Sequence, residues 1–252
     1  MSLDAFGDYS VADYKPALYA VGEGFGLSIG VMFLGVLVIS VLDPFAGVIG
    51  VKQMPGAKLG LETVSVIIAE VLLGVWYLRR TGRGWEYIDI QQPSLRDIGV
   101  AAGGVALILG AAMLAELLLV WAGVDSSKHA IEQMVTPENS QILLYLVPVS
   151  IFLVAPAEEF FYRNIIQRHI EQVTTPHRAL ILASFLFAAI HIPSYMSAQA
   201  TNMGVSLALV FLFSLILGAS YIRSQNLLVP IIIHGLFNAL QFLTLYGNLT
   251  IN

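Results

Sequence analysis

The apolar second half of the sequence contains a dense set of side chains that could carry out chemistry. The set consists of Glu158, Glu159, Arg163, His191, His234 and Asn238. A carboxylate can deprotonate a water molecule, and imidazole and amide groups can orient that water or donate to a developing oxyanion. A glutamate with two histidines can also bind zinc, although no HExxH motif is present. The residue types therefore allow hydrolysis by an activated water, with or without a metal ion.

The spacing of the two glutamates separates their roles. Residues four apart share one face of a helix, so Glu159 and Arg163 are predicted to pair and neutralise each other. Glu158 is rotated by about 100° from Glu159 and has no such partner on its own helix. The sequence therefore predicts that Glu158 is the carboxylate that remains free for chemistry.

The histidines show a similar spacing. His234 and Asn238 are four apart, which places an imidazole and an amide along one helical stripe. Phe187 is four residues before His191, and its side chain is predicted to line the site. Estimated helical depths put Glu158, His191, His234 and Asn238 at roughly 10–20 Å from one membrane surface. The list of candidate catalytic residues is therefore Glu158, His191, His234 and Asn238, with Glu159, Arg163 and Phe187 in support.

The composition indicates what must position these groups. Apolar residues make up 57% of the 252-residue chain and charged residues 12%, whereas soluble domains carry about 25% charged residues. We expect an all-α, polytopic transmembrane bundle of about seven helices with the catalytic core in the last four. The expected spans are Gly22–Leu42, Leu61–Leu78, Ile98–Val124, Gln141–Glu171, Ala179–Tyr195, Met203–Ile222 and Leu227–Tyr246.

The chain divides into a polar N-terminal tail (1–20), N-terminal transmembrane helices (21–125) and a catalytic core (126–252). With the N-terminus in the cytoplasm, the cytoplasmic side holds most of the basic residues: Lys15, Arg79, Arg80, Arg83, Arg96, Arg168, Arg178 and Arg223. This asymmetry predicts a multi-pass protein of the cell membrane with a cytoplasmic N-terminus and an active site in the cytoplasmic half.

Several classes of function are excluded or disfavoured. The chain has no cysteine, which excludes disulfides, a thiol nucleophile and Cys-ligated metals. A net charge of −5 without a basic run disfavours nucleic acid as a partner. The expected partners are the lipid bilayer and a peptide or protein substrate, and the pattern indicates no particular oligomeric state.

The motifs resemble those of one protease family. EEFFYR is similar to the EExxxR motif, FAAIH to FxxxH, and HGLFN to HxxxN of the CAAX protease and bacteriocin-processing (CPBP) family, the Rce1-like (Abi) intramembrane proteases. The resemblance covers about residues 140–246 and includes the order of the three motifs. It implies a metal-independent glutamic endopeptidase without a cofactor, which cleaves near the C-terminus of a prenylated CaaX-type substrate or another membrane-associated substrate.

The resemblance also implies a role for each matching residue. Glu158 would activate water together with His191, and His234 and Asn238 would form the oxyanion hole. Glu159 and Arg163 would support the site.

Three alternatives remain open at this point. The chain could be a zinc-dependent variant of the protease, a membrane binding or immunity protein on the same scaffold, or a transporter with a proton relay. The absence of inverted repeats disfavours the transporter. Glu70 and Glu116 lie within predicted helices without an assigned role. The remaining histidines, His129, His169 and His177, are expected to be solvated.

Overall fold

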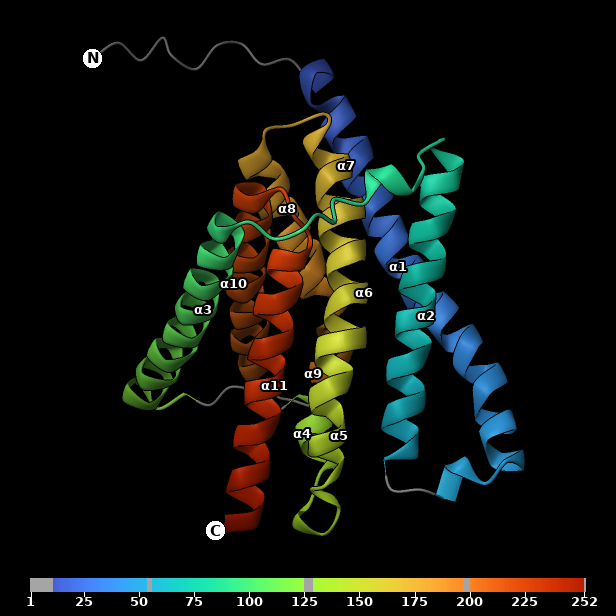
Figure 1. Cartoon of the computed structure of the whole chain (residues 1–252), viewed down its shortest axis with the longest axis vertical. Helices are drawn as coiled ribbons and strands as arrows, with labels where there is room; N and C mark the ends of the chain where they lie inside the picture. Colours follow the sequence, from blue (N-terminus) through green and yellow to red (C-terminus); the bar gives the residue numbers. More distant parts are fainter. Residues whose placement is uncertain (1–10, 54–55, 125–128, 197–199, 252) are drawn as a thin grey trace.

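The protein is a bundle of helices (Figure 1). The computed structural model describes residues 11–53, 56–124, 129–196 and 200–251, and these ranges contain helices and no strand. Within them, six helical segments are long and apolar enough to cross a membrane. Five are single helices: α1 (Val11–Val48), α2 (Ala57–Arg80), α3 (Leu95–Ala122), α10 (Ala200–Ser224) and α11 (Leu228–Ile251). The all-α transmembrane bundle predicted from composition is confirmed.

The sixth segment is a continuous helical run from Ile142 to Glu171. It consists of α5 (Ile142–Val149), η4 (Ser150–Val154), α6 (Ala155–Glu159), η5 (Phe160–Gln167) and α7 (Arg168–Glu171). Both η4 and η5 are π-helical, a conformation that is rare in proteins and frequent at functional sites. The two candidate glutamates therefore occupy one short α-helical turn between two π-helical stretches.

The fifth predicted span, Ala179–Tyr195, is wrong in its length. Helix α8 (Pro176–Ile190) has 15 residues, about 22 Å against a hydrocarbon core of about 30 Å. The chain turns at His191 and forms the short α9 (Ile192–Tyr195). Pro193 explains the early end, because a proline disfavours continued helix at the residue before it and lacks an N–H. His191 consequently lies at the end of a helix that is too short to span the hydrocarbon core.

Helix α1 is longer than expected. It begins at Val11, within the segment predicted to be a polar tail, and continues past the predicted end at Leu42 to Val48. Pro16 and Pro44 lie inside the helix without ending it, which transmembrane helices tolerate better than soluble ones. Residues 43–48 of the connection expected after Leu42 are therefore helical, and the first ten residues of the predicted tail lie outside the described ranges.

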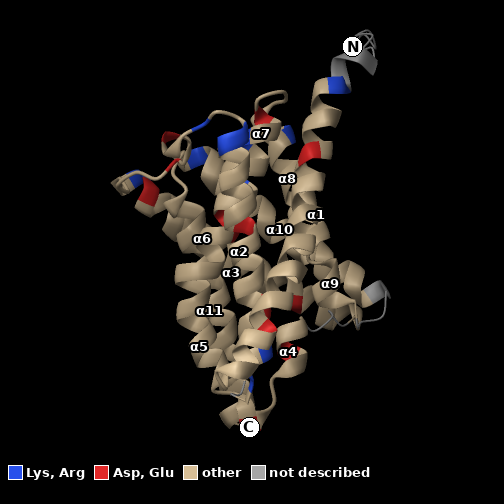
Figure 2. Cartoon of the chain, turned by 90° about the vertical axis from the view of Figure 1, so that its right-hand side faces the viewer, with Lys and Arg blue, Asp and Glu red and all other residues tan. Residues whose placement is uncertain are grey.

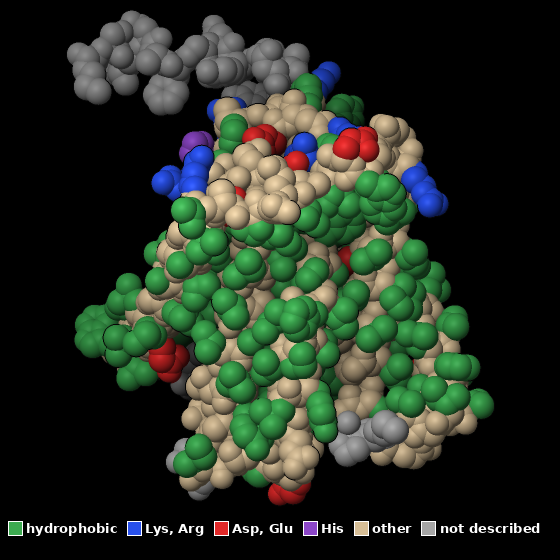
Figure 3. Space-filling model, viewed as in Figure 1, with side chains coloured by type: hydrophobic (Ala, Val, Ile, Leu, Met, Phe, Trp, Pro, Cys, Tyr) green, Lys and Arg blue, Asp and Glu red, His purple; other side chains and the backbone are tan. Residues whose placement is uncertain are grey.

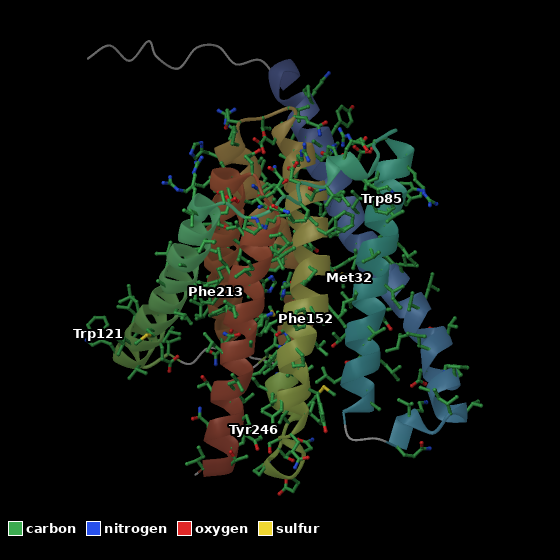
Figure 4. The ribbon with its side chains drawn as sticks, viewed as in Figure 1. Met32, Trp85, Trp121, Phe152, Phe213 and Tyr246 are labelled. Atoms are coloured by element: carbon green, nitrogen blue, oxygen red, sulfur yellow. The ribbon has the colours of Figure 1, made fainter. Side chains whose placement is uncertain are left out.

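The central run separates two groups of helices (Figure 1). The pair α1 and α2 packs on one side of it, α11 and α10 pack on the other, and α3 packs against α10 and α11. Helix α3 is buried only in its first half, at Asp97, Ala101, Gly104 and Ile108, and its far end with Trp121 points away from the bundle (Figure 4). The visible face is rich in hydrophobic side chains along the helices (Figure 3), as a lipid-facing surface requires.

Basic residues gather at the end of the bundle where the described chain begins (Figure 2). Three segments that connect helices are joined there by hydrogen bonds and an ion pair. Arg83 Nη2 donates to Gln172 Oε1 at 2.6 Å, Arg168 pairs with Asp89 at 3.0 Å, and Leu227 N donates to the Asp89 carbonyl at 2.6 Å. The segments that follow α2, α7 and α10 therefore meet at one end, and the C-terminus lies at the other (Figure 1).

Candidate functional site

Glu159 is the buried centre of the candidate site. Its side chain is fully buried, and its Oε2 accepts a hydrogen bond from Arg163 Nε at 2.8 Å. Its Oε1 is 2.8 Å from His234 Nδ1 on α11. A carboxylate paired with arginine can only accept, so His234 Nδ1 is the donor. The ion pair expected from the four-residue spacing is present, and the same carboxylate also holds a histidine from another helix.

Arg163 is tied to a third helix. Its Nη2 donates to Ser214 Oγ on α10 at 3.1 Å, and its guanidinium lies 5.2 Å from the centre of the Phe187 ring on α8. Both Arg163 and Ser214 are fully buried. Ser214 carried no signal in the sequence, because its partner is on another helix and no spacing rule connects the two.

Glu158 is the carboxylate that stays free of hydrogen bonds to the described residues. Its Oε2 is 3.8 Å from His234 Nε2, and its side chain is 17% exposed, in contrast to the fully buried Glu159. The two glutamates therefore contact opposite nitrogens of one imidazole. Glu158 is the one that a small molecule can still reach.

Close packing brings His234 to the glutamates. Gly235 follows His234, and a Cβ at this glycine would lie 3.0 Å from the Ile151 Cα on η4, where real Cβ atoms are rarely found. The absence of a side chain thus lets α11 lie directly against the central run. A larger residue at Gly235 would displace His234 from Glu158 and Glu159.

Phe187 on α8 and His191 at the end of that helix lie near His234. His191 Nδ1 is 2.7 Å from the Phe187 carbonyl oxygen, which can only accept, so Nδ1 carries the hydrogen. The Phe187 ring centre lies 4.6 Å from that of His191 and 6.2 Å from that of His234. The Phe187 ring therefore lies close to both imidazoles, and Nε2 of a neutral His191 is left as an acceptor.

Asn238 is one turn beyond His234 on α11 and is partly buried. No hydrogen bond joins it to the described residues. The structure thus assembles Glu158, Glu159, Arg163 and His234 by direct contacts and places His191 beside them through Phe187. Asn238 is related to His234 only by its place on the same face of α11, and its role stays a prediction.

The two glutamates left unassigned have different surroundings. Glu70 on α2 is 2% exposed and lies within electrostatic range of Glu158 and Glu159. Glu116 is on the exposed part of α3. The sequence alone could not show that Glu70 lies near the site and Glu116 does not. Both glutamates lie within predicted helices, and the sequence does not show which helices pack against α2 and α3.

The expectation that His129 is solvated is wrong. Its ring packs edge-on against Tyr195 at 5.3 Å between centres, and its Nδ1 accepts from Ile131 N at 3.2 Å. Burial lowers the pKa of His129 to about 4, and the nearby His191 contributes in the same direction. The expectation also fails for His169, which is bonded to the Tyr77 hydroxyl at 2.9 Å, whereas His177 is exposed.

The described ranges contain no group of three His, Asp or Glu side chains arranged to hold a metal ion. His234 Nδ1 is already engaged by Glu159, so only its Nε2 faces the candidate site.

Comparison with known proteins gives a family match within the second half of the chain. Residues 140–240 match the family model described as type II CAAX prenyl endopeptidase Rce1-like. Comparisons with curated proteins and with solved structures gave no match. The matched segment contains all six of the polar residues singled out from the sequence, from Glu158 to Asn238. Residues 140–240 are therefore similar to the Rce1-like family of type II CAAX prenyl endopeptidases, which is a family of peptidases.

Proposed function

We propose that the protein is a glutamic intramembrane endopeptidase in which Glu158 activates the attacking water. The observation that carries this proposal is the 3.8 Å approach of Glu158 Oε2 to His234 Nε2 while Glu159 holds His234 Nδ1. One glutamate is used to orient the imidazole, and the other remains free to accept a proton.

The distance between Glu158 and His234 suits a water-mediated step. At 3.8 Å the two atoms are too far apart for a direct hydrogen bond, but one water beside the gap can contact both. Glu158 takes a proton from this water, and the resulting hydroxide attacks the carbonyl carbon of the peptide bond. The same proton then passes to the leaving amine as the C–N bond breaks. His191, with its acceptor Nε2, helps to orient the water.

His234 and Asn238 supply the donors for the oxyanion. His234 Nδ1 already donates to Glu159, so donation from Nε2 requires the imidazolium form, which carries hydrogens on both nitrogens. The two carboxylates that flank the ring favour this cation by charge. The Asn238 side chain, one turn away on the same stripe, supplies the second donor.

The proposed substrate is the C-terminal region of a prenylated CaaX-type protein or another membrane-associated peptide. The family description supports a CAAX substrate. We place the N-terminus and the site on the cytoplasmic side of the cell membrane, because basic residues gather at the end where α11 begins. His234 is six residues after Leu228, about 9 Å along the helix from that end.

The test is cleavage of a defined peptide by the purified protein, followed by mass spectrometry. We expect the wild type to release a C-terminal fragment from a prenylated CaaX peptide and Glu158→Gln to release none. Glu138→Gln is the matched control, because Glu138 is an exposed glutamate outside the site. An unprenylated peptide tests the need for the lipid.

Two results would contradict the proposal. Folded wild type that cleaves neither peptide would favour a non-proteolytic role on this scaffold. Cleavage by Glu158→Gln at the wild-type rate would remove Glu158 as the base.

A further inference from the structure

Glu70 is a buried carboxyl beside the candidate site that the proposed hydrolysis does not use. It is 2% exposed, and its Oε2 has no hydrogen-bond partner among the described residues. The charged groups that act on it most strongly are the carboxyls of Glu158 and Glu159, and Tyr162 on η5 lies within the same electrostatic range. The site therefore contains three carboxyls close together in a water-poor environment.

Close helix packing explains why Glu70 reaches the site. Gly74 is one turn beyond Glu70, and a Cβ there would lie 2.3 Å from Phe160 Cε1, a distance that two atoms cannot adopt. Helix α2 can thus lie against α6 and η5 only because residue 74 has no side chain. On its other face α2 meets α1, which contributes apolar residues such as Val31 and Leu34 to the cluster around Ala69. The titratable groups facing Glu70 therefore come from the central run.

Charge balance decides the state of Glu70. Arg163 compensates Glu159, and His234, in the imidazolium form that the oxyanion role requires, compensates Glu158. Among the described residues, no further cation acts on Glu70. A third ionised carboxylate would be an uncompensated charge in the bilayer interior, next to two like charges.

We propose that Glu70 is a positioning residue that stays a neutral carboxylic acid beside Glu158, so that Glu158 is the carboxylate that ionises and takes the proton from water. This inference rests on the proposed function for the role of Glu158. The protonation of Glu70, however, can be measured without any proteolysis.

The direct test is infrared spectroscopy of the purified full-length protein with ¹³C-labelled glutamate. A neutral carboxylic acid has a C=O stretching band that is separate from the bands of a carboxylate. We expect this band, shifted by the label, in the wild type at neutral pH and a clear loss of its intensity in Glu70→Gln. Glu62→Gln is the matched control, because Glu62 is on the same helix, half-exposed and 3.9 Å from Lys58. A wild type without the band, or a Glu70→Gln variant with undiminished intensity, would overturn the inference.

The second test is the peptidase activity of Glu70 variants. Glu70→Ala should lower kcat by about tenfold or more with little change in KM, and Glu70→Gln should recover most of this loss because it is neutral and of similar shape. The alkaline side of the kcat profile should change in Glu70→Gln, since the second carboxyl of a coupled pair is gone. A purely structural residue would not alter that profile.

The infrared and activity measurements together distinguish failure of the proposed function from failure of the role proposed for Glu70. If the wild type cleaves no peptide, the proposed function fails, and the infrared band still decides whether Glu70 is neutral. If a folded Glu70→Gln loses cleavage as fully as Glu70→Ala, the positioning role is wrong whatever the infrared result.

Discussion

Glu159 holds His234 by its Nδ1 at 2.8 Å, on the side of the ring opposite Glu158. This hydrogen bond decides which nitrogen of His234 faces the candidate site, as the carboxylate partner of a catalytic histidine does in other hydrolases. Because Arg163 binds the other oxygen of Glu159, the orientation of His234 depends on a pair of fully buried charges.

The first prediction separates the charge of Glu159 from its contact with His234. Glu159→Leu alone should lower both kcat and stability, because Arg163 is left unpaired and His234 Nδ1 loses its acceptor. The double variant Glu159→Leu/Arg163→Met removes both charges, so its thermal stability should recover towards the wild-type value. Its kcat should stay low, by about 10²-fold or more, because His234 is no longer fixed.

Thermal unfolding in detergent and peptide cleavage measure the two quantities on the same samples. Recovery of activity together with stability would show that Glu159 acts only as the counter-charge of Arg163.

The second prediction concerns stability alone. Arg163→Met leaves the fully buried Glu159 without its cation, and breaking a buried pair in this way costs about 3–5 kcal/mol. Lys58→Met is the comparison, because its 3.9 Å pair with Glu62 is exposed and exposed pairs contribute about 0–1 kcal/mol. Equal shifts in the unfolding temperature of the two variants would contradict the buried pair as a major contributor.

The third prediction is a pH dependence of stability. The pKa of His129 is about 4 in the folded protein, and a histidine in the unfolded chain has a pKa of about 6.5. The unfolded state therefore binds more protons between these values. Stability is complete above about pH 6.5 and falls by up to about 1.4 kcal/mol per unit as the pH drops towards 4.

His129→Gln should remove this part of the pH dependence. Unfolding temperatures of the wild type, His129→Gln and the exposed-residue control His177→Gln at neutral and mildly acidic pH provide the measurement. If His129→Gln and the wild type lose the same stability on acidification, His129 is not the group responsible.

The fourth prediction distinguishes the glutamic mechanism from a zinc-dependent one. A base and two donors supplied by side chains need no metal, so chelators should leave cleavage of the peptide unchanged. Loss of activity in a chelator followed by recovery on addition of zinc would favour the metal alternative instead.

The spacing within one helix predicted the local part of the site well. Glu159 and Arg163 are four residues apart and pair as expected, and Glu158 is left free beside them. Composition likewise predicted a helical membrane bundle, because a chain with so few charges must face lipid over much of its surface.

Contacts between helices could not be predicted in the same way. The hydrogen bonds of Glu159 with His234 and of Arg163 with Ser214 join segments 75 and 51 residues apart, and only the packing of α11 and α10 on the central run creates them. Glu70 reaches the site because Gly74 permits close approach. Helix α8 ends early because of Pro193. The apolar residues on both sides of this proline led to the prediction of a longer span.

The role of Glu158 is tested by the kcat of Glu158→Gln on the prenylated peptide, measured beside wild type and Glu138→Gln. The amide keeps the volume of the side chain but cannot take a proton from water. We expect kcat to fall by about 10²–10⁴-fold with KM little changed, while the control keeps the wild-type rate. A folded Glu158→Gln variant with a kcat within about threefold of wild type would contradict Glu158 as the base.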